Sequence, residues 1–246
     1  MKDECYESNE EKIPQVVDLG LISGTRWASC NLGASQPWEY GGYYAWGETE
    51  EKDVYNHATY RYFEGEDTNG DGFYEKDEKC ENLGENICNT EYDVAHMKLG
   101  DGWQMPTREQ FMELIDNCIK EWTELHGVKG LKFIGPNGNS IFLPAGGCRN
   151  GSGFDNFGDS GCYWSSMVST HARFNAHNLL FSSSYAFWYG YCSRSIGHSI
   201  RPVKGIESFD KRINISEAFE LMPSCQLSNT SSKSDNKPSA SCWSLN

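Results

Sequence analysis

Residues 106–144 read PTREQFMELIDNCIKEWTELHGVKGLKFIGPNGNSIFLP, and they hold the two clearest structural signals of the chain. Thr107 and Gln110 have the spacing of a capping box, in which each side chain bonds the backbone amide of the other, so a helix is predicted to begin here. Its apolar side chains follow at helical spacing on one face: Phe111, Leu114, Ile115, Cys118, Ile119 and Trp122. Residues 135–139, between two apolar runs, predict a hairpin turn.

The whole chain divides by composition into a lead-in, a domain and a tail. Residues 1–15 are polar and charged, residues 16–205 form the predicted domain, and residues 48–90 are an acidic insertion within it. Residues 206–246 are rich in Ser and lack apolar periodicity, which predicts a flexible tail. Apolar residues make up 38% of the 246, enough for a hydrophobic core, and the 25 Gly favour a loop-rich domain over a helical bundle.

The charge is unevenly distributed along the chain. The formal net charge is −14, which argues against nucleic acid as a partner. Between residues 126 and 205, however, Asp155 and Asp159 are the sole acidic residues, against seven Lys and Arg. We therefore expect an acidic half and a neutral, aromatic half with different roles.

The sequence contains no apolar run long enough for a membrane helix, so membrane insertion is not expected. The N-terminus lacks the apolar core of a signal peptide. As written, the chain fits a phage-borne or cytoplasmic protein, and a truncated N-terminus would make it a cell-surface protein. The ten cysteines are irregularly spaced and are expected to be free thiols, with Cys80 and Cys88 the pair expected in an exported protein.

Blocks of sequence resemble a known family in their order along residues 16–204. They are Val17-Asp18-Leu19-Gly20-Leu21, Trp27-Ala28-Ser29-Cys30-Asn31-Leu32-Gly33-Ala34, Tyr44-Ala45-Trp46-Gly47-Glu48-Thr49, Tyr92-Asp93-Val94-Ala95, Trp103-Gln104-Met105-Pro106-Thr107, the Gly135–Pro144 turn and strand, Tyr163-Trp164-Ser165-Ser166 and Ser199-Ile200-Arg201-Pro202-Val203. The chain resembles the Fibrobacter succinogenes major paralogous domain, which is similar to C-type-lectin-fold proteins. The resemblance implies an α+β, C-type-lectin-like domain of two helices, small antiparallel sheets and long loops. It also implies a binding surface on loops at one end.

Residues 148–198 are the predicted binding surface, because Tyr, Phe, Trp, Ser, Gly and Asn give antibody loops their contact area and adaptable hydrogen bonds. Tyr185, Phe187, Tyr189 and Tyr191 alternate, so one face of their strand is expected to be exposed. Trp103 and Trp164 are expected in the core. The candidate ligand-binding residues are His171, Arg173, Phe174, His177, Leu180, Tyr185, Phe187, Tyr189, Tyr191, Cys192, Ser193, Ser195 and His198.

The resemblance also suggests how this surface arises. Some family members resemble the variable proteins of diversity-generating retroelements, in which AAC codons are rewritten to NNC codons. In residues 168–200 only Trp188 lies outside the set that NNC encodes. Ordinary drift in a Tyr- and Ser-rich loop is the competing explanation. Both a diversified receptor binder and a fixed-specificity adhesin or glycan-binding module of a Bacteroidetes cell fit this pattern. The expected partner is a protein or glycan receptor on a cell surface, and a homo-oligomer remains open.

The acidic insertion contains a predicted calcium site. Residues 67–78 fit the twelve-residue loop D-x-[DN]-x-[DN]-G-x5-E, in which alternate oxygen ligands surround a hard cation and Gly72 permits the sharp turn. The predicted ligands are Asp67, Asn69, Asp71, the Phe73 carbonyl, Glu75 through water, and Glu78. We expect this Ca2+ to be structural.

Catalysis is not expected, because the six His residues are scattered and no pattern marks a base or a zinc site. One enzymatic alternative stays open. The formylglycine-generating enzymes share the C-type-lectin-like fold and use a pair of cysteines. Cys148, Cys162 and Cys192 lie in the corresponding half of this chain, although they do not align with that family's motif.

Overall fold

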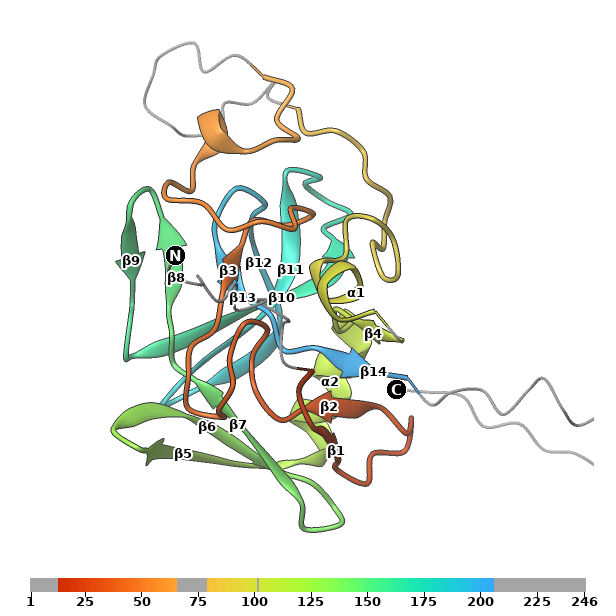
Figure 1. The fold of residues 1–246 in the computed structure, drawn as a ribbon, viewed down its shortest axis with the longest axis vertical. Coiled ribbons are helices and arrows are strands. Elements are labelled where there is room, and N and C mark those ends of the chain that lie inside the picture. The colour runs from red at the N-terminus through yellow and green to blue at the C-terminus, as the bar shows by residue number, and fades with distance from the viewer. Residues whose placement is uncertain (1–12, 66–78, 101, 206–246) are drawn as a thin grey trace, which may run out of the picture. The chain divides into compact units, whose positions relative to one another are not determined.

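The computed structural model describes residues 13–65, 79–100 and 102–205 (Figure 1). The predicted calcium ligands, most of the polar lead-in and the Ser-rich tail lie outside the described residues. Within the described part, no helix has both the length and the apolar character that crossing a membrane requires.

The prediction of an α+β, C-type-lectin-like fold was wrong, because the described residues are mostly β (Figure 1). They form fourteen strands in four sheets, against two α-helices. The α-helices are α1 (Val94–Leu99) and α2 (Arg108–Asn117), and a 3-10 turn, η1, spans His57–Thr59. Helix α2 ends at Asn117 because the chain from Ile119 onward pairs as a strand with residues 128–134.

The two larger sheets join segments from both ends of the described chain. One has the order β1 (Val16–Asp18), β2 (Arg26–Ala28), β14 (Val203–Lys204) and β4 (Trp103–Gln104). The other has the order β12 (Ala186–Ser193), β11 (Asn175–Ser182), β10 (Ser160–Val168), β13 (His198–Ser199) and β3 (Tyr43–Tyr44). In the second sheet β13 runs parallel to β10, with Tyr163 opposite Ser199.

The two smaller sheets are hairpins or extensions of hairpins. One contains β5 (Ile119–Leu125), β6 (Val128–Ile134) and β7 (Ser140–Pro144). The other contains β8 (Cys148–Asn150) and β9 (Gly153–Asp155). The hairpin predicted around residues 135–139 is confirmed, since β6 and β7 pair antiparallel on either side of that turn.

Helix α2 confirms the predicted start and corrects the predicted end. Thr107 accepts from the Gln110 amide, and the Gln110 side chain accepts from the Thr107 amide. Phe111, Leu114 and Ile115 are buried as expected. The helix stops at Asn117, however, so Ile119 and Trp122 are not part of its apolar face.

The reason for this early end lies in the next hairpin. Residues Ile119 to Leu125 pair in full register with β6. The two-residue connection, His126 and Gly127, has φ values of 50° and 83°. Positive φ at both central positions is the signature of the tight turn that matches the twist of antiparallel strands. The backbone pairing of seven residues therefore decides the structure here, against the helical spacing of the apolar residues. As a result Ile119 lies on the sheet and is 65% exposed.

Gly127→Ala is expected to lower the free energy of unfolding by about 1–2 kcal/mol, because an L side chain at this φ is strained. A Cβ at Gly127 meets nothing within 4 Å, so strain is the sole cost of the change. Gly153→Ala is the control, because that glycine has ordinary φ and space for a methyl group. Urea unfolding checks the prediction, and equal midpoints for Gly127→Ala and wild type would contradict it.

Helix α1 is capped by Asp93, which is fully buried. Its carboxylate accepts from four backbone amides, those of Asn89, Ala95, His96 and Met105, at 3.0–3.1 Å. One side chain thus accepts hydrogen bonds from backbone amides at the start of α1, in the preceding turn and just after β4. The Thr90 hydroxyl, three residues before Asp93, donates to the Ile87 carbonyl and takes no part in the cap.

The core consists of two main apolar clusters on opposite faces of β10. Tyr163 points into the cluster that also holds Trp27 and Phe111. Trp164 points into the cluster that holds Trp46 and Trp103. Trp103 and Trp164 are 1% and 0% exposed, which confirms that they are core residues.

A buried arginine ties three segments together at the edge of this core. Arg201 is 0% exposed. Its guanidinium donates to Asn31 Oδ1 at 3.0 Å, to the Ala28 carbonyl at 3.0 Å and to the Phe142 carbonyl at 2.6 Å. It therefore connects β2 and the loop after it to β7.

Candidate functional site

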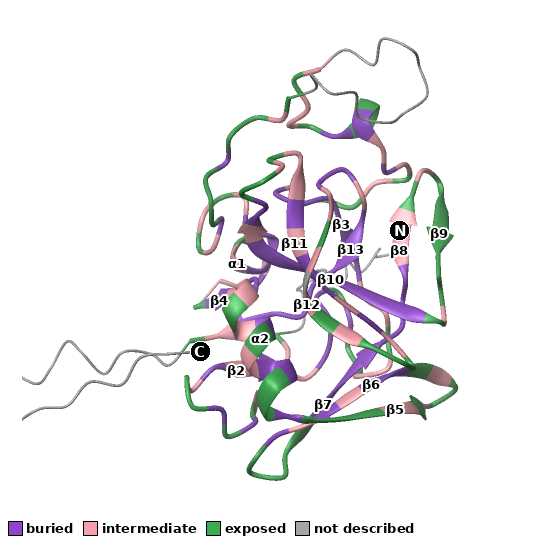
Figure 2. Cartoon of the chain, turned by 180° about the vertical axis from the view of Figure 1, so that it is seen from behind, coloured by how far each residue is buried: buried purple, intermediate pink, exposed green. Residues whose placement is uncertain are grey.

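The outer face of β12 presents aromatic side chains to solvent, as their alternation predicted. Ala186 and Trp188 pack against the core cluster that contains helix α2 residues. Tyr185, Phe187 and Tyr191 are 38%, 37% and 66% exposed, and Figure 2 shows the exposed positions of this strand in green. Pairing with β11 fixes the backbone from which Phe187 and Tyr191 project.

The turn between β11 and β12 carries the most ordered part of this surface. The rings of Tyr185 and Phe187 stack with centroids 5.0 Å apart and planes at 11°. The Ser182 amide donates to the Tyr185 carbonyl and closes the turn. Between these residues the Ser182 and Ser184 hydroxyls lie 3.2 Å apart. A flat aromatic pair thus lies directly beside hydroxyl groups.

Two hollows adjoin at this turn, and we call them together the turn cleft. They have volumes of about 260 Å³ and 450 Å³, and both are lined by Trp122, Ser182, Ser183 and Tyr185. The smaller is completed by Lys120, Leu131, Ser184 and Ala186, and the larger by Lys129, Asn156, Asp159 and Ser160. The turn cleft therefore combines two aromatic side chains with hydroxyl, amide, carboxylate and ammonium groups.

The predicted binding residues fall into three groups. His177, Leu180, Tyr185, Phe187 and Tyr191 lie on β11 and β12 or their turn, exposed or half-buried, and the side chain of Tyr189 lies outside the description. His171, Arg173 and Phe174 lie in the loop before β11. There Arg173 donates to Asn82 Oδ1 at 2.9 Å, which ties this loop to the described part of the insertion.

The third group corrects the prediction for Ser195 and His198, which lie inside the protein. Ser195 and His198 are 0% and 1% exposed, so neither can contact a receptor on the surface. Cys192 and Ser193 are half-buried, and the Ser193 hydroxyl lies 2.9 Å from that of Ser195. The chain turns inward after Tyr191 because Arg194 is buried, where its Nε donates to the Tyr60 hydroxyl.

Comparison of the chain with protein-family models, with curated proteins and with solved structures gave no match. The family resemblance in the sequence and the calcium loop therefore stay predictions. A functional proposal depends on the chemistry of the described residues.

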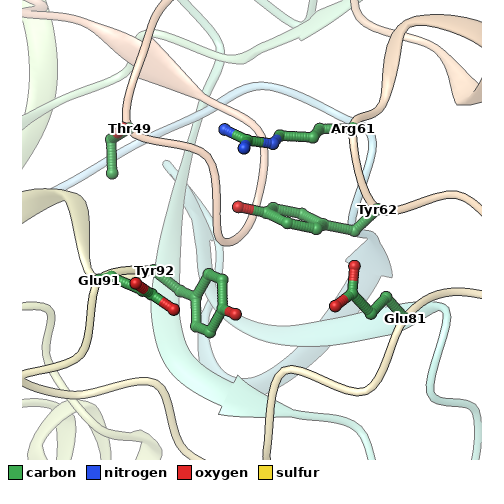
Figure 3. Close-up of a pocket in the computed structure, with 6 residues that line it drawn as sticks. All are labelled: Thr49, Arg61, Tyr62, Glu81, Glu91 and Tyr92. Carbon is green, nitrogen blue, oxygen red and sulfur yellow. The ribbon is translucent and has the colours of Figure 1, made fainter.

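Figure 3 shows a further hollow, of about 390 Å³, between the described parts of the insertion and the start of α1. Its lining residues are Thr49, Arg61, Tyr62, Glu81, Glu91 and Tyr92. The rings of Tyr62 and Tyr92 meet edge to face, at 89° and 5.6 Å. This hollow carries charges of both signs but offers no flat aromatic face like that of Tyr185 and Phe187.

No disulfide joins Cys80 to Cys88. Cys88 Sγ instead contacts the Ser166 hydroxyl at 3.1 Å. The structure does bring together Cys148, Cys162 and His198, whose ligand atoms all lie within 4.8 Å of one another. None of these three lines the turn cleft or the hollow of Figure 3.

Several lining residues of the turn cleft were missed by the sequence analysis. Trp122 was assigned to the apolar face of a helix, and Lys120 was not considered. Asn156 and Asp159 follow β9, about 25 residues before the turn that they face. No local pattern marks these residues, because packing of β5 and the 156–160 segment against the β11–β12 turn brings them together.

Proposed function

We propose that this protein is a binding protein that holds a glycan of a cell-surface receptor in the turn cleft. The observation that carries the proposal is the exposed, parallel pair of Tyr185 and Phe187 beside two polar hollows. A sugar ring has an apolar C–H face and a rim of hydroxyl groups. An aromatic ring covers the first, and serine hydroxyls, amides and carboxylates bond the second.

The size of the hollows favours a glycan over a protein receptor. The larger hollow, about 450 Å³, lies within the range of small-ligand sites, roughly 300–1,000 Å³, and the adjoining one adds about 260 Å³. A stable protein partner would instead need a flat patch of about 800 Å² on this side. The proposal covers both a fixed-specificity adhesin and a protein diversified by a retroelement, because the exposed side chains of β11 and β12 make the contacts in both.

Tyr185→Ala is expected to weaken glycan binding about tenfold or more, a loss of about 1.4 kcal/mol or more, because the stacking face is removed. An array of plant, bacterial and animal oligosaccharides identifies the ligand, and titration calorimetry with the strongest binder measures the affinity. Tyr185→Phe keeps the ring and should bind within a few-fold of wild type.

Phe157→Ala is the matched control, since Phe157 is also an exposed aromatic residue, 48% accessible, outside the turn cleft. It should leave the affinity unchanged. The proposal fails if the array shows no binding to any oligosaccharide, or if Tyr185→Ala and Phe157→Ala bind equally well.

A further inference from the structure

Three strands bring together one sulfur- and nitrogen-rich cluster inside the protein. Cys148 begins β8, Cys162 lies in β10 and His198 begins β13. Gly147 is bridged to Gly161, so the residues that follow them, Cys148 and Cys162, are neighbours. His198 lies beside them because β13 pairs with β10 at the next residue. The three ligand atoms all lie within 4.8 Å of one another.

Cys192 lies close to this group without belonging to it. It lies in β12, is half-buried and packs against the apolar cluster of Trp164, the ring on which His198 stacks. We call Cys148, Cys162, Cys192 and His198 the thiol cluster. Backbone pairing thus brings two thiols and one imidazole together, with a third thiol on a nearby strand.

The imidazole of His198 has an unsatisfied atom. His198 is 1% exposed, and its ring stacks on Trp164 at 3.9 Å, which fixes the ring plane. Its Nδ1 is buried and has no hydrogen-bond partner among the described residues. A buried polar atom without a partner costs free energy, so native proteins satisfy nearly all of them. The ring also offers a nitrogen as a ligand atom beside the thiols of Cys148 and Cys162.

We propose that Cys148, Cys162 and His198 bind one thiophilic metal ion, Zn2+ or Cu+, with Cys192 as the fourth ligand. Thiolate and imidazole are the ligands that both ions prefer, and three Cys with one His form a closed tetrahedral zinc site. With Zn–S bonds of about 2.3 Å, the ligand atoms of such a site are ~3.8 Å apart. The ligand atoms of Cys148, Cys162 and His198 therefore need to approach one another by at most about 1 Å, and Cys192 needs to move in from a greater distance. The ion would fasten the β8–β9 hairpin to the sheet that carries β12, independently of glycan binding.

The first experiment uses the full chain, reduced and kept free of oxygen, and adds Co2+ as a spectroscopic substitute for Zn2+. We expect one equivalent to give a thiolate-to-cobalt charge-transfer band that Zn2+ then abolishes. Such a band identifies sulfur ligands, so it separates this site from the oxygen ligands predicted in residues 67–78. Titration with Cu+ against a chromophoric chelator then decides which of the two ions binds more tightly.

The matched variants are Cys148→Ser and Cys118→Ser. Cys118 is a buried thiol outside the cluster, 5% exposed, so its replacement should leave the cobalt spectrum unchanged. Cys148→Ser should weaken metal binding by about 100-fold or more, since it removes a ligand and not merely the support of one.

A measurement on the wild-type protein tests the proposal even if Cys148→Ser fails to fold. Zn2+ or Cu+ should slow alkylation of Cys148 and Cys192, mapped by mass spectrometry, and leave the rate at Cys80 unchanged. The proposal is overturned if the reduced protein binds neither ion, or if both ions leave all alkylation rates unchanged. It is equally overturned if Cys148 and Cys162 form a disulfide in air and the re-reduced pair binds no metal.

Discussion

Replacing Arg201 with methionine is expected to lower the free energy of unfolding by about 3–5 kcal/mol, because it leaves three buried acceptors without their donor, each at a cost of about 1–3 kcal/mol. These acceptors are Asn31 Oδ1 and the carbonyls of Ala28 and Phe142. Methionine fills most of the same volume, so the loss measures the hydrogen bonds more than a cavity. Urea unfolding followed by tryptophan fluorescence gives the value.

Arg173→Met provides the comparison for this prediction. Its guanidinium is 53% exposed and lies 3.8 Å from Glu85, itself 72% exposed. A surface pair of this kind contributes about 0–1 kcal/mol. If Arg201→Met unfolds at the same urea concentration as Arg173→Met, Arg201 does not link the segments in the way its contacts indicate.

The second large effect is expected at Asp93. Asp93→Ala should lower the free energy of unfolding by about 3 kcal/mol or more. An ordinary helix cap contributes about 1 kcal/mol. Asp93 in addition serves the amides of Asn89 and Met105, and burial prevents water from replacing it. Asp93→Asn should cost less, because it keeps one acceptor oxygen for the α1 amides.

Thr107→Ala is the internal standard for Asp93→Ala, because Thr107 caps α2 at a half-buried position with one such bond. It should cost about 1 kcal/mol. Differential scanning calorimetry of the three variants tests the order Asp93→Ala, Asp93→Asn, Thr107→Ala. A cost for Asp93→Ala as small as that for Thr107→Ala would mean that the buried amides find other acceptors.

Features that depend on a few neighbouring residues could be predicted from the sequence. The capping box of Thr107 and Gln110 needs one helical turn, and the 135–139 hairpin needs one tight turn. The exposed face of β12 follows from alternation within a single strand. In each case the residues that determine the structure lie close together in the chain, so their sequence pattern is enough to predict it.

The fold class and much of the site could not be predicted, because they depend on distant pairing. Strands β3, β4, β13 and β14 have two residues each, too few for any alternation to show. Trp122 was predicted on a helix, but it lies in β5 because β5 pairs along its whole length with β6. Similarly, Cys148 and His198 lie 50 positions apart and meet because β13 pairs with β10 and Gly147, just before Cys148, is bridged to Gly161 of β10.

The position of β14 between β2 and β4 has a consequence for synthesis in the cell. Val203 pairs with Trp27 and with Gln104, so a sheet begun near the start of the chain is completed by nearly its last described residues. Contacts this distant in sequence form slowly and late. Until the ribosome has released residue 204, β2 and β4 have unpaired edges that invite association with other chains. The nascent protein is therefore expected to need chaperone protection until translation passes this strand.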